Sequence, residues 1–194
     1  MVYTALGISG DPCSGKTGLI EQLAQGLGWP VVSIGGLFRK RFERWESENS
    51  LYRQGTDFDE WWANTVTDAD IRKVNREAAT RLAQGKVILD SRYIAENAKH
   101  LPSVARVFLT APLEMRATRA LAAGRYPGVP LRGANGVMDL LHKRGRNEYE
   151  KGQSLFGIDY RDARDYHLTL NTELLTIEQE ISQVLALIRS PITS

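Results

Sequence analysis

The sequence has very little cysteine: Cys13 is the only one among 194 residues, so no disulfide can form within the chain. Proteins without disulfides are typical of reducing compartments, and we therefore expect a cytoplasmic protein. Long apolar runs are missing as well. No segment approaches the roughly 20 apolar residues of a membrane span, and residues 1–9 lack the basic start and apolar stretch of a signal peptide. We expect no membrane partner.

An excess of charge of one sign is also absent. The 25 basic and 23 acidic side chains leave a net charge of +2, so bulk charge does not point to a nucleic-acid partner. With 42% hydrophobic and 25% charged residues, the composition is typical of a globular protein, and the length suits a single domain over residues 1–194. We expect small-molecule partners, and the composition leaves monomer and dimer open.

The sequence does contain short apolar runs that alternate with helical patterns. The runs predict five strands, at residues 4–8, 30–34, 86–89, 105–109 and 167–170. Apolar residues at helical spacing predict helices at residues 16–27, 68–83, 113–123, 137–155 and 176–188, the last opened by a capping box of Thr176 and Gln179. Residues 36–65 are expected to form short helices outside the sheet. This order indicates an α/β fold with a parallel sheet covered on both faces.

The turn after the first strand is rich in glycine and ends in lysine. Residues 10–17 (GDPCSGKT) match the P-loop pattern without a mismatch. Glycines let backbone N–H groups point at phosphate oxygens, and the following helix adds the positive end of its dipole. Lys16 is expected to reach the β- and γ-phosphates of ATP, and the Thr17 hydroxyl to bind Mg²⁺. The predicted ATP site includes Gly10, Asp11, Pro12, Cys13, Ser14, Gly15, Lys16 and Thr17.

Three charged residues follow or close predicted strands, at the edge where ligands of parallel sheets bind. Arg39 follows the second strand and Arg92 the third, and the planar fork of arginine suits an acceptor phosphate. Asp90 closes the third strand, where a carboxylate can order the water shell of Mg²⁺. Structural roles stay open for all of them: a solvated helix arginine for Arg39, a surface loop residue for Arg92 and a helix cap for Asp90.

A basic segment at residues 116–156 is expected to act as a lid that closes over the phosphates and excludes water. The positive charges come from Arg116, Arg119, Arg125, Arg132, Lys143, Arg144 and Arg146, and glycine hinges from Gly124, Gly128, Gly133 and Gly136. A solvated helical face followed by a loop is the alternative, because most charge runs are no more than that.

Residues 33–39 (SIGGLFR) resemble the Ser-x-Gly-x-x-x-Arg segment of nucleoside monophosphate kinases. The resemblance is closer to the archaeal-type cytidylate kinases, in which further stretches match in the same order. These stretches are residues 87–92 (VILDSR), 111–117 (APLEMRA), 156–159 (FGID), and Tyr166 with residues 171–172 (NT). The resemblance spans about residues 4–188.

The resemblance implies a five-stranded sheet of order 2-3-1-4-5 and Mg²⁺-dependent phosphoryl transfer from ATP to a nucleoside monophosphate, CMP or dCMP. It implies acceptor contacts at Ser33, Gly35, Arg39, Arg92, Arg144 and Lys151, an insertion at residues 36–66 that binds the acceptor, and further ATP contacts at Arg116 and Asn171. Lys16, Asp90 and Arg144 would be the catalytic residues. Lys151 stands where the family usually has a second arginine.

The departures from the family pattern fall on the acceptor side. The loop at residues 125–130 looks longer, Ser91 replaces a glycine, and Trp61–Trp62 is an unusual pair that could stack on a base or belong to the core. Two other functions therefore stay open. A kinase of the same fold could phosphorylate an alcohol, with Asp57, Asp59 or Asp90 as base. The second alternative is a nucleotide-dependent switch that transfers no phosphoryl group.

Overall fold

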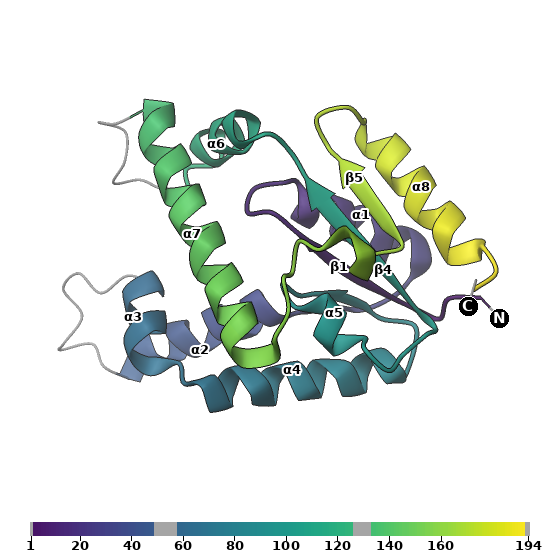
Figure 1. Ribbon diagram of the computed structural model, residues 1–194, viewed down its shortest axis with the longest axis horizontal. Coiled ribbons are helices and arrows are strands. Elements are labelled where there is room, and N and C mark those ends of the chain that lie inside the picture. The colour runs from purple at the N-terminus through teal and green to yellow at the C-terminus, as the bar shows by residue number, and fades with distance from the viewer. Residues whose placement is uncertain (1, 49–57, 126–132, 193–194) are drawn as a thin grey trace.

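The sheet has five parallel strands, as expected. The computed structural model describes residues 2–48, 58–125 and 133–192 (Figure 1). The strands are β1 (Ala5–Gly10), β2 (Val31–Ser33), β3 (Ile88–Asp90), β4 (Val104–Thr110) and β5 (Leu168–Asn171). Their order is β2-β3-β1-β4-β5, which confirms both the α/β fold and the order that the family resemblance implied. The order places β1, and therefore the turn after it, in the middle of the sheet.

The register of the strands brings the predicted site residues to one edge. Ser33 pairs with Asp90, and Asp90 in turn pairs with Ile8 of β1. On the other side of β1, Thr110 pairs with Asn171. All these residues lie at or near the carboxyl ends of their strands, where ligands of parallel sheets bind.

Both faces of the sheet are covered by helices. The helices are α1 (Lys16–Leu27), α2 (Ile34–Glu48), α3 (Phe58–Thr65), α4 (Asp68–Ala83), α5 (Ile94–Asn97), α6 (Leu113–Ala122), α7 (Gly133–Phe156) and α8 (Ile177–Arg189). Successive residues of a strand point to opposite faces. Leu6 accordingly packs with α1 and α8, whereas Ala5 packs with α4 and α5. Burial of each large apolar side chain contributes about 1.5–3 kcal/mol to the stability of this sandwich.

Capping fixes where two of the covering helices begin. The Thr67 side chain accepts a hydrogen bond from the backbone of Asp70, whose side chain bonds back to the Thr67 N–H. The same reciprocal pair forms between Thr176 and Gln179 at the start of α8, which confirms the capping box predicted there. The capping boxes fix the first turns of α4 and α8 against the sheet.

The segment predicted as a glycine-rich loop over residues 124–136 is partly helical. Helix α7 begins at Gly133, so the expectation that the helix starts near Val137 was wrong by about one turn. Gly133 and Gly136 are helical residues, and Gly136 is buried, so the structure does not place them in a hinge loop. Gly128 and Arg132 lie outside the described residues. Val137 and Leu141 pack on Ala117 and Ala120 of α6, and this burial explains why the segment is helical although it is rich in glycine.

Helix α7 is anchored at both ends and polar in its middle. Near its start, Val137 and Leu141 pack on Ala117 and Ala120 of α6. Near its end, Leu155 joins the core beneath α4 and α5. Figure 1 shows α7 crossing from α6 toward α2 and α4, on the side of the sheet where the strands end. The charged middle of α7 therefore faces the turn after β1.

Candidate active site

The turn between β1 and α1 has the backbone of a phosphate cradle. Gly10 passes so close to β4 that an added Cβ would lie 2.4 Å from the Leu109 carbonyl oxygen, which excludes any side chain there. Cys13 adopts a left-handed conformation with φ of 63°, and helix α1 starts directly behind the turn at Lys16. The curled loop and the helix N-terminus together form an anion-binding site.

Lys16 lies folded over this loop. Its Nζ donates to the carbonyl oxygens of Gly10 at 3.0 Å and Asp11 at 3.2 Å. Burial, followed by the positive charge of Arg92, lowers the pKa of Lys16 from 10.5 to about 7, although the negative charge of Asp90 opposes the shift. Keeping the ammonium group protonated therefore costs free energy, and the negative charge of a bound phosphate would offset that cost.

Arg92 connects the loop to helix α7. Its guanidinium donates to the Gly10 carbonyl oxygen and reaches Glu148, with 3.0 Å from Nη2 to Oε1 and 3.0 Å from Nε to Oε2. Arg144, one turn earlier on α7, also contacts Oε1 of Glu148 through Nε at 3.1 Å. Two of the predicted acceptor arginines, Arg92 and Arg144, therefore meet at one carboxylate beside the P-loop.

On the opposite side of the loop, Asp11 is held by two residues that the sequence did not single out as site residues. Its Oδ1 accepts from Arg161 Nε at 2.9 Å, and its Oδ2 accepts from the Thr110 hydroxyl at 2.9 Å. Arg161 passes beneath Gly145 of α7, where an added Cβ would lie 2.6 Å from its Nη2. The Tyr160 ring lies between the two arginines, 5.1 Å from Arg92 and 5.0 Å from Arg161.

Asp90 and Ser33 form the third side of the site. The Ser33 hydroxyl donates to Asp90 Oδ2 at 2.9 Å and accepts from the Gly36 N–H at 3.1 Å, so it also caps the start of α2. Thr17 is exposed at the start of α1. Within the described residues no three His, Cys, Asp or Glu side chains gather as a metal cage. A hydroxyl plus a single carboxylate still fits Mg²⁺, which keeps several waters and uses few protein ligands.

Comparison with known proteins decides the family. Residues 6–174 match the model of the "Cytidylate kinase-like family". The chain belongs to this family. It is 31% identical over 180 residues to a cytidylate kinase of Pyrobaculum aerophilum and 30% identical over 180 residues to that of Pyrobaculum islandicum. Both alignments cover 91% of this chain and 88% of the relative. The protein is therefore a phosphotransferase, a kinase of the cytidylate kinase-like family.

A solved structure agrees on the fold. Shikimate kinase from Bacteroides thetaiotaomicron superposes with a TM-score of 0.63 and 17% identity, covering 96% of this chain and 99% of that one. At this level of identity the likeness concerns the α/β architecture only. Within the described residues, no helix is both long and apolar enough to cross a membrane.

Of the two further ATP contacts implied by the family, Arg116 contacts the P-loop and Asn171 lies at the end of β5. Arg116 is buried, and it donates to the carbonyl oxygens of Ala111 at 2.9 Å and Pro12 at 3.4 Å. Asn171 ends β5, where its Oδ1 accepts from the Glu173 N–H at 3.1 Å. Arg116 thus braces the back of the P-loop, and Asn171 shapes the turn after β5.

Three predicted acceptor residues stand apart from the Arg92 and Arg144 pair. Arg39 and Gly35 are exposed on α2, and within the described residues Arg39 makes no ion pair. Lys151 of α7 contacts Asp68 at the start of α4, with 2.9 Å between Nζ and Oδ1. Their contacts with an acceptor stay predictions.

Two of the three departures from the family pattern have structural explanations, and the third, the loop at residues 125–130, lies outside the described residues except for Arg125. The hydroxyl of buried Ser91 donates to Asn97 at 2.6 Å and accepts from the Tyr93 N–H, so it ties the Arg92 loop to α5. Trp61 is buried, and Trp62 packs edge-on against Phe38 with ring centroids 4.4 Å apart. Both tryptophans therefore contribute to packing between α2 and α3.

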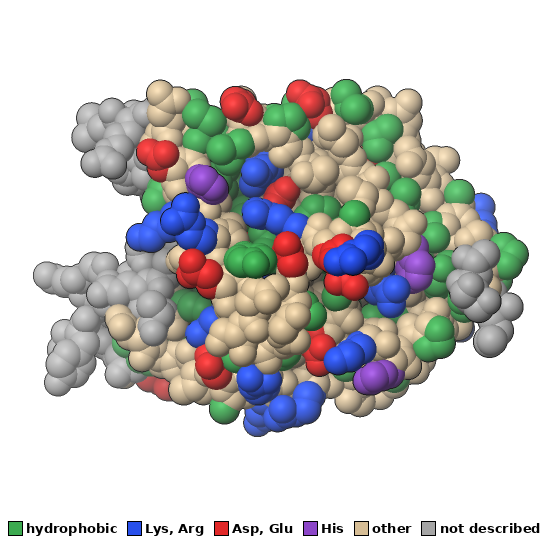
Figure 2. All heavy atoms as spheres, in the orientation of Figure 1, with side chains coloured by type: hydrophobic (Ala, Val, Ile, Leu, Met, Phe, Trp, Pro, Cys, Tyr) green, Lys and Arg blue, Asp and Glu red, His purple; other side chains and the backbone are tan. Residues whose placement is uncertain are grey.

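The site residues that the sequence reasoning missed are Thr110, Glu148, Tyr160 and Arg161. Glu148 follows Arg144 by four residues, a spacing that places both on one face of a helix and could have revealed it. Nothing local marks Tyr160 or Arg161, because their partners lie far away in the chain. Figure 2 shows basic and acidic side chains interspersed along the surface that α7 occupies in Figure 1.

Proposed function

We propose that the protein transfers the γ-phosphate of Mg²⁺-bound ATP to a nucleoside monophosphate, with CMP or dCMP as the preferred acceptor. The relatives named cytidylate kinase support this acceptor class. The observation that carries the proposal is the placement of Arg92, which bonds both the P-loop and, with Arg144, the Glu148 carboxylate. A carboxylate and a phosphate offer an arginine fork the same oxygen geometry, so an acceptor phosphate fits at this point.

Donor and acceptor bind to different elements in this proposal. The P-loop backbone and Lys16 hold the donor phosphates, and Thr17 with Asp90 would hold the metal, which supplies positive charge to the phosphates when bound. Arg92 and Arg144 orient the acceptor phosphate, with Ser33, Gly35, Arg39 and Lys151 completing its site. The acceptor phosphate is already ionised, so no residue has to remove a proton. Catalysis then consists of positioning and charge neutralisation.

A substrate panel tests the function. ADP release from Mg²⁺·ATP is measured with CMP, dCMP, UMP, AMP and GMP, and with nucleosides and metabolite alcohols as the contrasting class. We expect CMP or dCMP to give the highest kcat/KM. An uncharged alcohol as best acceptor would instead favour an alcohol kinase with Asp57, Asp59 or Asp90 as its base, and ATP binding without any transfer would indicate a switch. Asp57 lies outside the described residues.

A further inference from the structure

The Tyr160 side chain holds two arginines of the site in place. The residue is fully buried, and the guanidinium groups of Arg92 and Arg161 lie over its ring at 5.1 and 5.0 Å. Each such contact is worth about 0.5–2 kcal/mol. Because Arg92 bonds the Gly10 carbonyl and Arg161 bonds Asp11, the ring stands directly beside the P-loop.

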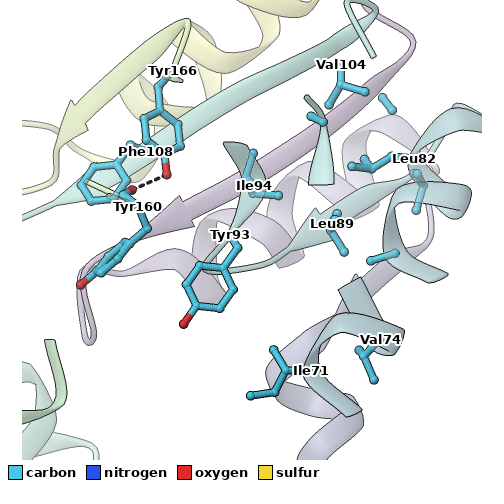
Figure 3. Packing of buried hydrophobic residues seen from close by; sticks show 14 of the residues in the cluster. Ile71, Val74, Leu82, Leu89, Tyr93, Ile94, Val104, Phe108, Tyr160 and Tyr166 are labelled. Carbon is cyan, nitrogen blue, oxygen red and sulfur yellow. Dashed lines mark hydrogen bonds between the residues drawn. The ribbon is translucent and has the colours of Figure 1, made fainter. Parts of the chain in front are cut away.

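The hydroxyl of Tyr160, unlike its ring, makes no contact of this kind with a neighbouring group. It is buried, and within the described residues it forms no hydrogen bond. The neighbouring tyrosines differ: the Tyr166 hydroxyl donates to the Tyr160 carbonyl oxygen, and the Tyr93 hydroxyl donates to the Glu148 carbonyl oxygen at 3.2 Å. Figure 3 shows the Tyr160 hydroxyl directed away from Phe108 and Tyr166, whereas Tyr166 points back toward the Tyr160 backbone. A buried polar group without a partner costs about 1–3 kcal/mol.

A phenylalanine would keep the ring and avoid that cost. The ring contacts with both arginines, and the tilted packing on Phe108 with centroids 6.4 Å apart, need no hydroxyl. The oxygen is therefore unexplained by the fold alone. The charged groups that act on it are Arg92, Glu148, Arg161 and Asp11, which surround the place of a phosphate in the proposed reaction.

We propose that the Tyr160 hydroxyl is a further catalytic group, which donates a hydrogen bond to an oxygen of the phosphate held between the P-loop and Arg92. This inference rests on the proposed function, since it assigns the phosphate to that reaction. Burial, together with the negative charge of Glu148, raises the pKa of Tyr160, so the hydroxyl keeps its proton and acts as a donor. A neutral donor aimed at the transferring phosphoryl group stabilises charge that spreads over its oxygens during transfer.

The decisive variant is Tyr160→Phe, with Tyr166→Phe as the matched control. Loss of the orphan hydroxyl should leave the Tm of Tyr160→Phe equal to or above that of the wild type, while kcat falls by about 10- to 100-fold. Tyr166→Phe loses the hydrogen bond to the Tyr160 carbonyl oxygen, so its Tm should fall while kcat stays within about twofold. A higher Tm combined with a lower kcat cannot come from a purely structural residue.

A binding measurement separates this inference from the function itself. Inorganic phosphate is titrated into wild type and Tyr160→Phe by calorimetry, a measurement that does not depend on which acceptor is correct. We expect several-fold weaker binding in the variant. If the wild type phosphorylates no monophosphate, the proposed function fails on the substrate panel alone. The Tyr160 inference is overturned if Tyr160→Phe keeps both wild-type phosphate affinity and wild-type turnover, or if its Tm falls as in Tyr166→Phe.

Discussion

At the scale of single residues, the hydrogen bonds of Lys16 to the P-loop and its lowered pKa lead to a testable prediction. Its partly buried ammonium group lies against two backbone carbonyls, and its pKa is lowered to about 7, chiefly by desolvation. A bound polyphosphate places negative charge next to Nζ and favours the protonated form. Nucleotide binding and proton binding are therefore linked at this residue.

We predict that Mg²⁺·ADP binding takes up a proton above neutral pH. At about pH 8 a group with this pKa is mostly neutral before binding and charged afterwards, so uptake should approach one proton per site. Titration calorimetry in buffers of different ionisation enthalpy measures this number directly. Saturating Mg²⁺ keeps the nucleotide itself fully ionised. Lys16→Met is the control and should show no uptake; equal uptake in that variant would assign the proton to another group.

Arg144 gives the second prediction at this scale. Its Nε lies 3.1 Å from Glu148, close to the phosphate position proposed beside Arg92. Arg144→Lys keeps the charge but loses the planar fork, whereas Arg144→Ala loses both. Both variants should lower kcat, alanine by about a hundredfold or more, with little change in ATP affinity. Normal kcat in Arg144→Ala would mean that this arginine belongs to a solvated face.

At the scale of elements, helix α7 decides how the site is built. Its ends pack in apolar clusters, so the position of its charged middle depends on the packing of α6 at one end and of the core near α4 at the other. The contact between Lys151 and Asp68 adds a polar tie between α7 and α4. This contact gives Lys151 a structural role in competition with its predicted acceptor role.

A pair of variants separates the two roles of Lys151. Asp68→Asn breaks the ion pair and leaves the lysine in place, whereas Lys151→Ala removes both. An exposed ion pair contributes about 0–1 kcal/mol, so both variants should show the same small loss of Tm. We predict that only Lys151→Ala raises the KM for the monophosphate. Equal KM values in both variants would leave Lys151 with the structural role alone.

At the scale of the whole molecule, the strands and most helices could be predicted because their signals are local. The apolar run before Gly10 and the capping box at Thr176 each involve neighbours in sequence. The order of strands came from the family resemblance, since parallel pairing joins segments as far apart as Ile8 and Asp90.

Apart from the local contact of Glu148 with Arg144, the missed residues have partners that are far away in the sequence. Arg161 and Asp11 are 150 positions apart, and Arg92 and Glu148 are 56 apart. No periodicity or motif connects such pairs. The early start of α7 was missed because glycine-rich sequence favours a loop locally, whereas packing against α6 overrides that preference.

The same arrangement makes a prediction about the whole chain, because a ligand that joins donor and acceptor must contact the P-loop and the middle of α7 at once. We expect a bisubstrate analogue, ATP linked through its phosphates to CMP, to slow amide hydrogen exchange along α7 more than ATP or CMP alone does. Helix α8 packs against the sheet and α1 through Val184 and Ile188 and serves as the internal control, whose exchange should change only with global stability. At about 100 times its Kd the analogue should also stabilise the fold by about 2.7 kcal/mol, which raises Tm by several degrees. If protection is confined to the P-loop and α1 while the analogue is bound, α7 takes no part in holding the two substrates together. The basic segment at residues 116–156 would then not act as a lid.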